Sequence, residues 1–340
     1  MNGCTLIGQT ILLAMLAGGA SAQDALRINH TQAIGTHNSY HIAPQGEQRA
    51  MILEYDRETF EAINYTHPPL DVQLENGVRS FELDIVYQPE GFVTVHVPEI
   101  DFETNCPTFI DCLETMKRWS LEHASHIPIM VLVQVKDSFS IELQETEIYP
   151  TNGEILDQMD EALLSVFDRN QLITPDDIRG DYATLEEAVL KKGWPSLDEG
   201  RGRFLFAFHD SPEKMDIYAE GRPSLEGRPM FATTSAGRPD AAILVVNDPN
   251  SDEIPQLLEA GYLVRTRADS GVREPRLNDR SRFEQAMKSG AHYIHTDFPK
   301  GQPHPETGYE VVFPDGGTVR CNPLLAPGNC AADELEPGIE

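Results

Sequence analysis

Five side chains that could carry out phosphodiester chemistry stand near the ends of apolar runs in this chain of 340 residues. They are two histidines, one asparagine and two carboxylates: His37, Asn38, Glu82, Asp84 and His96. A pair of histidines can move protons to and from a phosphodiester. An amide oxygen and two carboxylates form a set of hard oxygen ligands that suits Ca²⁺ better than zinc. These residue types therefore indicate proton transfer beside a Ca²⁺ site.

The elements that would position these residues follow a repeated pattern, in which an amphipathic helix and a glycine precede an apolar strand with an acidic end. The strand after Gly77 contains Asp84, and the strands after Gly261 and Gly290 lead to Asp269 and Asp297. Glycine suits the left-handed residue that ends a helix. Short and mostly apolar strands are typical of a parallel sheet covered on both faces. The repeats therefore predict αβ units around a parallel sheet.

Eight candidate strands follow from the apolar runs. They lie near residues 32–35, 80–86, 128–135, 203–208, 230–233, 242–246, 262–267 and 292–296, and the pattern is weakest in the fifth and sixth. Residues 92–97 are predicted to form a hairpin with the second strand. Helices are predicted over 108–123, 154–167 and 184–192. Eight strands that alternate with helices predict an α/β fold, a single (β/α)₈ TIM-type barrel.

Polar residues stand at the carboxyl ends of most predicted strands, where the chemistry of such a barrel takes place. In chain order they are His37, Asn38, Glu82, Asp84, Gln134, Lys136, His209, Asp210, Arg265, Arg267, Asp269 and Asp297. Residues two apart on a strand point to the same face. The last strand of a closed barrel lies beside the first. We therefore expect these side chains to converge on one rim.

The first 22 residues carry no charged side chain and are interpreted as a secretory signal peptide. Residues 11–17 form a short apolar core, and Ala20-Ser21-Ala22 is a small-residue cleavage site. This predicts a secreted or periplasmic protein with a barrel domain over 23–330. The acidic tail, residues 331–340, is predicted to be disordered.

Four cysteines remain after such a cleavage, and an even number in an exported chain favours disulfides. Pairing in sequence order, Cys106 with Cys112 and Cys321 with Cys330, would close two short loops. The alternative is four buried free thiols. The spacings do not match a zinc finger or ribbon.

The formal net charge of −29 excludes nucleic acid as a partner and disfavours binding to anionic membranes. Such a chain would repel nucleic acid phosphates. Contact with anionic membranes is expected to be at most transient unless Ca²⁺ screens the charge. The acidity indicates either tolerance of high salt or simply a well-solvated surface.

Several motifs resemble the bacterial calcium-dependent, phosphatidylinositol-specific phospholipase C family. The matching stretches are GTHNSYH at 35–41, GVRSFELDI at 77–85, the segment 95–137, TLEEAVLKKGWPSL at 184–197, GRFLFAF at 202–208, LVRTRAD at 263–269 and SGAHYIHTDFP at 289–299. The resemblance implies a distorted TIM barrel and Ca²⁺ as cofactor. It also implies that Asn38, Glu82 and Asp84 are Ca²⁺ ligands and that His37 and His96 are catalytic. Gln134 takes the place of a further carboxylate ligand, and it can still offer a carbonyl oxygen but no charge.

The resemblance also implies that a hydroxyl of the substrate attacks the phosphorus. We assign His37 to the phosphate and His96 to the leaving group as acid, with Asp297 holding the His37 tautomer. Lys136, Arg265 and Arg267 are candidate phosphate contacts. Other interpretations remain open, because the two arginines could be ordinary ion-paired residues and Arg79 could pair with Glu82 and Asp84.

Two other functions compete with a phosphoinositide-type phosphodiesterase. A glycerophosphodiester phosphodiesterase shares the barrel and the Glu-x-Asp metal site, but typically has His-Arg-Gly where this chain has His37-Asn38-Ser39. A non-catalytic, Ca²⁺-stabilised barrel that binds sugar or inositol phosphates would agree with Gln134 and the acidity. The presence of both His37 and His96 favours the enzyme. The headgroup of the phosphodiester substrate and the oligomeric state do not follow from the sequence.

Overall fold

The computed structural model describes residues 25–337. The predicted signal peptide, 1–22, lies outside the described residues. Within them, no helix combines the length and the apolar character needed to cross a bilayer.

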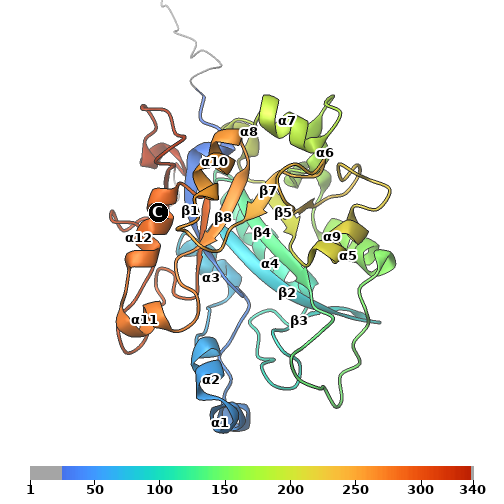
Figure 1. Ribbon diagram of the computed structural model, residues 1–340, viewed down its shortest axis with the longest axis vertical. Helices are drawn as coiled ribbons and strands as arrows, with labels where there is room; N and C mark the ends of the chain where they lie inside the picture. Colours follow the sequence, from blue (N-terminus) through green and yellow to red (C-terminus); the bar gives the residue numbers. More distant parts are fainter. Residues whose placement is uncertain (1–24, 338–340) are drawn as a thin grey trace, which may run out of the picture.

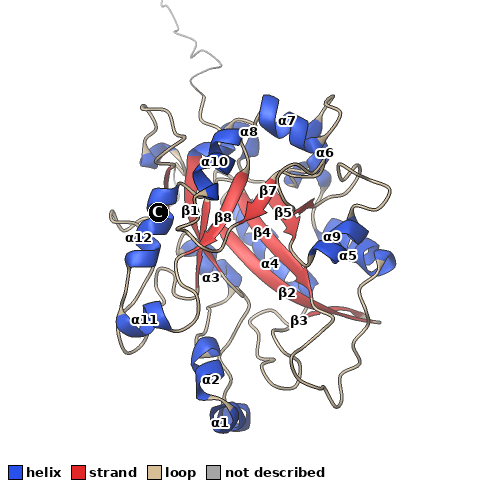
Figure 2. Ribbon diagram, viewed as in Figure 1, coloured by secondary structure: helices blue, strands red, loops and turns tan. Residues whose placement is uncertain are grey.

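Eight parallel strands form a nearly closed barrel, as predicted (Figure 2). In their order around the barrel they are β6 (Phe231–Ala232), β5 (Phe204–Phe208), β4 (Ile129–Val135), β2 (Ser80–Gln88), β1 (Thr31–Thr36), β9 (Tyr293–Thr296), β8 (Leu263–Arg267) and β7 (Ile243–Val245). Each predicted strand is present. Among the described residues no ladder joins β6 to β7. The barrel is therefore distorted at the fifth and sixth strands, where the sequence pattern was weakest.

Helices surround the barrel (Figure 1), and two further short strands pair with barrel strands β2 and β1. The helices are α1 (Gly46–Tyr55), α2 (Arg57–Ile63), α3 (Leu70–Glu75), α4 (Phe109–Glu122), α5 (Gly153–Val166), α6 (Pro175–Arg179), α7 (Leu185–Lys191), α8 (Leu197–Gly200), α9 (Pro212–Tyr218), α10 (Glu253–Ala260), α11 (Arg273–Leu277) and α12 (Ser281–Ser289). The strand β3 (Gly91–Thr94) forms the predicted hairpin with β2, and β10 (Val319–Cys321) pairs with β1. The predicted helices over 108–123, 154–167 and 184–192 correspond to α4, α5 and α7.

Local sequence signals explain where these elements begin and end. Thr108 and Asp111 form a capping box at the start of α4. Gly261 ends α10 with a φ of 111°, and Gly290 ends α12 with a φ of 77°. Both φ values lie in the left-handed region that glycine adopts without strain. The repeated helix, glycine and strand pattern therefore has the predicted geometry.

The C-terminal segment corrects one prediction, because residues 331–337 pack against the barrel and are not disordered. Leu335 is buried, and Glu336 makes two hydrogen bonds with the buried guanidinium of Arg79, at 2.6 and 2.8 Å. A short 3₁₀ helix, Ala332–Glu334, precedes them. The prediction failed because it considered only the acidic composition of the tail and not a buried cation that the tail could neutralise.

Both predicted disulfides are present, Cys106–Cys112 and Cys321–Cys330. The alternative of buried free thiols is therefore wrong.

Candidate active site

The carboxyl ends of the barrel strands form one end of the molecule. Figure 1 shows α1, α2 and α11, which follow β1 and β8, at this end, while α7 and α8 lie at the opposite end. His37 follows β1 directly, and Glu82 and Asp84 lie within β2. The predicted site residues therefore come from strands that are neighbours in the barrel.

His37 is held by a carboxylate on the neighbouring strand end. Its Nδ1 lies 2.9 Å from Asp297 Oδ1, and Arg267 Nη2 donates to Asp297 Oδ2 at 3.0 Å. Burial alone would raise the pKa of Asp297, but the charges of Arg267 and His37 lower it well below its usual range. An ionised Asp297 fixes the hydrogen of His37 on Nδ1. His37 Nε2 is then left facing Glu82 Oε1 at 4.0 Å, with a quarter of the side chain exposed.

The residues after His37 explain the local geometry of the first loop. Asn38 has a φ of 46°, in the left-handed region that asparagine tolerates better than most residues. Ser39 joins the loop to β2, since its N–H donates to Glu82 O and its Oγ accepts from Glu82 N, both at 2.9 Å. The amide nitrogen of Asn38 donates to the Tyr65 hydroxyl at 3.2 Å. Its carbonyl oxygen is thereby left for another partner.

Glu82 is a buried carboxylate with cationic neighbours. Its Oε2 accepts hydrogen bonds from Arg265 Nη2 and lies 3.3 Å from His295 Nδ1. Burial alone would raise the pKa of Glu82, but the charge of Arg265, followed by that of His37, lowers it well below its usual range. Glu82 is therefore a carboxylate that remains ionised at the rim.

One buried oxygen of Asp84 lacks a hydrogen-bond partner among the described residues, and the buried Tyr40 hydroxyl, which also lacks one there, lies near this carboxylate. Its Oδ2 accepts from Lys136 Nζ at 3.1 Å, whereas its buried Oδ1 has no hydrogen-bond partner among the described residues. Gln134 is paired in register with Asp84 across the parallel β2–β4 ladder, so the two side chains lie on the same face. A buried carboxylate oxygen without a partner is costly. The oxygens of Asn38, Glu82, Asp84 and Gln134 are of the kind that Ca²⁺ prefers, and the unpaired Oδ1 fits such an ion.

The two arginines of β8 are engaged with carboxylates. Arg265 is buried between Glu82 and Asn247, and Arg267 bridges Asp297 and Asp269. The structure thus agrees with the alternative that they are ion-paired residues, and phosphate contact by either remains a prediction. Arg79 is not the partner of Glu82 or Asp84, because it pairs with Glu336.

His96 follows β3 and lies beside the same rim. The preceding residue, Val95, donates its N–H to Asp84 O at 3.2 Å. His96 Nδ1 lies 2.7 Å from Asp101 Oδ2, and His41 Nε2 lies 3.0 Å from both oxygens of the same carboxylate. Burial alone would raise the pKa of Asp101, but hydrogen bonds from the two histidines lower it.

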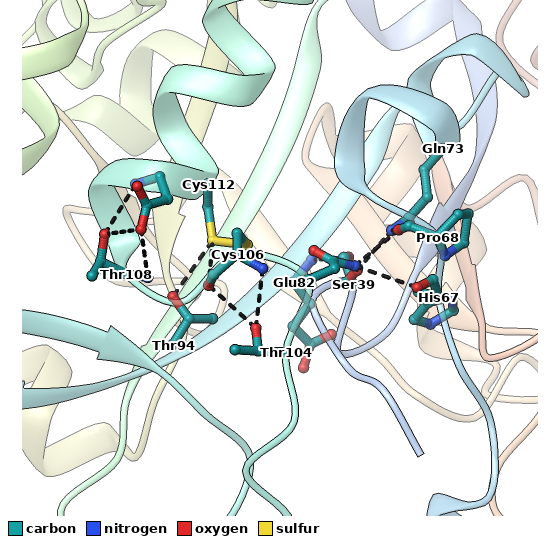
Figure 3. The surroundings of a disulfide bond; sticks show 12 residues. Ser39, His67, Pro68, Gln73, Glu82, Thr94, Thr104, Cys106, Thr108 and Cys112 are labelled. Carbon is teal, nitrogen blue, oxygen red and sulfur yellow. Dashed lines mark hydrogen bonds between the residues drawn. A yellow bond between two sulfur atoms is a disulfide. The ribbon is translucent and has the colours of Figure 1, made fainter. Parts of the chain in front are cut away.

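The first disulfide supports the loop that leads away from this carboxylate. Figure 3 shows Cys106 and Cys112 beside Thr94 and Thr104. The neighbouring residue, Asn105, donates its amide hydrogens to the carbonyl oxygens of Ser39 and Pro68, at 3.1 and 2.9 Å. The disulfide therefore restrains a residue that joins the first loop to the segment after His96.

Sequence reasoning missed three contributors to the site. Asp101 lies in an irregular loop with no periodicity, Tyr65 belongs to the segment after α2, and His295 points inward from β9. Tyr65 and His295 contact predicted site residues that are distant in sequence, Asn38 and Glu82, and only the fold brings them together. Asp101 lies five residues from its partner His96, but the irregular turn between them gives no sequence signal.

Comparisons with known proteins agree with this geometry. The family model described as "Phosphoinositide phospholipase C, Ca2+-dependent" matches residues 26–93 and 87–323. A calcium-dependent phosphoinositol-specific phospholipase C from Pseudomonas sp. superposes with a TM-score of 0.60 at 18% identity, covering 89% of this chain and 97% of that chain. A Ca²⁺-dependent phosphatidylinositol-specific phospholipase C from Streptomyces antibioticus gives a TM-score of 0.59 at 18% identity, covering 88% of this chain and 99% of that chain. At this identity the two structures support the barrel fold alone. No curated protein matched the sequence.

Proposed function

The chain belongs to the family of Ca²⁺-dependent phosphoinositide phospholipases C, and from that premise we propose that it cleaves a phosphoinositide-type phosphodiester outside the cytoplasm. A neighbouring hydroxyl of the substrate attacks the phosphorus. A new P–O bond forms, the P–O bond to the leaving alcohol breaks, and a cyclic phosphodiester results. The two disulfides support an oxidising, exported location, secreted or periplasmic.

One observation carries this proposal: two histidines at the same rim each have one ring nitrogen held by a buried carboxylate. Asp297 holds Nδ1 of His37, and Asp101 holds Nδ1 of His96. The Nε2 atoms are then the nitrogens left to exchange protons with substrate. Two partly exposed histidines held in this way are suited to taking one proton from the attacking hydroxyl and giving one to the leaving oxygen.

The two histidines take different parts. His37 Nε2 accepts the proton of the attacking hydroxyl or stabilises charge on the phosphate, since it lies near Glu82 and is quarter exposed. His96 donates a proton from Nε2 to the leaving oxygen. Lys136, partly exposed beside Asp84, contributes positive charge for the phosphate. Arg267 acts through Asp297, whose carboxylate it neutralises.

Asn38, Glu82, Asp84 and Gln134 would hold Ca²⁺. When bound, the ion would neutralise phosphate charge and lower the pKa of the attacking hydroxyl. Arg265 and Lys136 keep the two carboxylates paired in its absence.

The test is turnover of phosphatidylinositol and of soluble glycerophosphoinositol by the purified protein, with Ca²⁺ and with EDTA. We expect Ca²⁺-dependent formation of inositol cyclic phosphate. His96→Ala should abolish turnover of both substrates while Ca²⁺ still raises the melting temperature. A linear product from glycerophosphodiesters alone would favour a glycerophosphodiester phosphodiesterase. A melting temperature raised by Ca²⁺ with no turnover of any diester would favour a binding module.

A further inference from the structure

The carboxylate of Asp101 lies between two histidines, and only one of them is assigned to the chemistry. His96 Nδ1 lies 2.7 Å from Oδ2, and His41 Nε2 lies 3.0 Å from Oδ1. The rings of His41 and His96 meet edge to face with centroids 5.7 Å apart. Asp101 and His41 are fully buried, whereas His96 is about one-fifth exposed. Of these three residues, the partly exposed one is thus His96, which lies beside the rim.

The hydrogen positions in this unit follow from the partners of each nitrogen. His41 Nδ1 lies 3.0 Å from Tyr65 O, and a carbonyl oxygen can only accept. His41 Nε2 faces an ionised carboxylate, which also only accepts. The partners of the His41 ring are thus acceptors, and its Nε2–H is the donor toward Asp101. Asp101 likewise accepts a hydrogen from His96 Nδ1, so the His96 tautomer is determined by Asp101.

The backbone brings these three residues together through tight local pairing. Val97 and Asp101 form an antiparallel bridge, which turns the chain back beneath His96. His41 forms a second bridge with Thr104. Glu99, within the turn, has a φ of 68°, an unusual conformation for a residue with a side chain. The two bridges therefore fix the backbone at Asp101 itself and three residues after it.

A metal ion would be a different explanation for two histidines and one carboxylate. Zinc has bonds of about 2.0–2.2 Å, which hold two ligand atoms of a tetrahedral site roughly 3.3 Å apart. The nitrogen–oxygen distances here are 2.7 to 3.0 Å. These are hydrogen-bond distances, and His41 Nδ1 is already directed at a carbonyl oxygen. Hydrogens, and not a metal, join the three residues.

We propose that Asp101 is a positioning residue for protonation of the leaving group, and that His41 is the buried donor that holds Asp101. Asp101 keeps the hydrogen of His96 on Nδ1 and orients the ring so that Nε2 faces the leaving oxygen. His41 Nε2 lies 3.0 Å from both carboxylate oxygens and gives Asp101 a second, buried hydrogen-bond donor that holds it in place. The inference rests on the proposed role of His96 as the acid, so its test must separate the two.

Leaving groups of different basicity give that separation. Glycerol is a poor leaving group that needs a proton, whereas 4-nitrophenolate leaves without one. We therefore compare glycerophosphoinositol with the 4-nitrophenyl ester of inositol phosphate, both soluble, in the presence of Ca²⁺. Asp101→Asn has a single carbonyl oxygen for two donors. We expect kcat for the glycerol ester to fall about 100-fold or more, kcat for the nitrophenyl ester to fall less than about 5-fold, and both KM values to stay unchanged.

Three matched variants make the outcome decisive. Asp160→Asn removes a buried carboxylate that accepts from Tyr218 and Arg228 away from the rim, and it should affect both substrates equally. His41→Asn should reproduce the selective loss, and it serves as the second variant if Asp101→Asn does not fold. His96→Ala should also act selectively. If His96→Ala lowers both rates equally, His96 is not the acid. If His96→Ala is selective but Asp101→Asn and His41→Asn are not, the positioning role is wrong.

Discussion

Asp297 illustrates how one buried carboxylate can set the tautomer of a side chain for which we propose a catalytic role. It lies between the guanidinium of Arg267 and Nδ1 of His37, and its pKa is held well below the usual range. It therefore stays ionised at every pH at which the protein is expected to work. Replacing it by asparagine preserves the shape but permits the wrong His37 tautomer.

For Asp297→Asn we predict that kcat falls about 10⁴-fold with little change in KM, in line with the loss seen when the carboxylate of a catalytic triad is replaced by an amide. Steady-state kinetics with glycerophosphoinositol would measure it. Asp160→Asn is the control, because Asp160 is a buried carboxylate that accepts from Tyr218 and Arg228 away from the rim. A kcat for Asp297→Asn within tenfold of the parent value would remove Asp297 from the scheme.

Gln134 is the residue at which this chain departs from the ligand pattern implied by its motifs. It lies beside Asp84 on the same face of the sheet and brings no charge. Ca²⁺ affinity rises with the number of charged ligands. We predict that Gln134→Glu lowers the Ca²⁺ concentration for half-maximal activity about tenfold and that Gln134→Ala raises it. Calorimetric Ca²⁺ titration would give the affinities, and identical values for all three proteins would show that this position does not contact the ion.

At the scale of elements, the side chain of Glu99 attaches the loop between β4 and α5 to the turn that follows His96. The carboxylate of Glu99 accepts hydrogen bonds from the backbone N–H groups of Gln144, Glu145 and Thr146, at 2.9, 2.8 and 2.7 Å. These bonds lower its pKa to about 2. Because the folded-state pKa lies below the ordinary value, the attachment is complete above about pH 4.5 and weakens as the pH falls toward 2.

We predict that Glu99→Gln increases amide hydrogen exchange in residues 138–150 at pH 7 and leaves exchange in the barrel strands unchanged. The two charged oxygens of Glu99 accept three backbone hydrogens, whereas glutamine has one neutral carbonyl oxygen and accepts more weakly. Glu103→Gln is a suitable control in the same loop, since its side chain makes no hydrogen bond among the described residues. Unchanged protection of residues 138–150 would mean that other contacts hold this loop.

The elements were largely predictable from sequence because their signals are local. Glycines at the ends of α10 and α12, a capping box at α4 and short apolar runs marked strands and helices within a few residues. The gap between β6 and β7 was not predictable, since it depends on how a two-residue strand meets a three-residue strand from another unit. The contact of Asp101 with His41 spans sixty residues and leaves no local pattern.

At the scale of the whole molecule, the proposed site and the buried ion pair of Arg79 lie at opposite ends of the barrel. The site residues lie at the carboxyl ends of the strands, whereas Arg79 immediately precedes β2. Arg79 is buried against Trp119, with its guanidinium carbon 4.8 Å from the ring centroid, and the C-terminal segment supplies its only carboxylate among the described residues. Such a division is expected of barrels of this type.

This division leads to a prediction about Glu336. Its carboxylate accepts from Arg79 through both oxygens and from Ile127 N at 2.9 Å. Glu336→Gln leaves a buried guanidinium without its counter-charge, a change that typically costs about 3–5 kcal/mol. We therefore expect the free energy of unfolding in urea to fall by about that amount while kcat at 25 °C is unchanged, because the pair lies far along the strands from the rim.

Glu334→Gln, an exposed change in the same segment, should alter neither quantity. If Glu336→Gln unfolds at the same urea concentration as the parent protein, the segment packs on the barrel without stabilising it; if kcat falls as well, the two ends of the barrel are coupled.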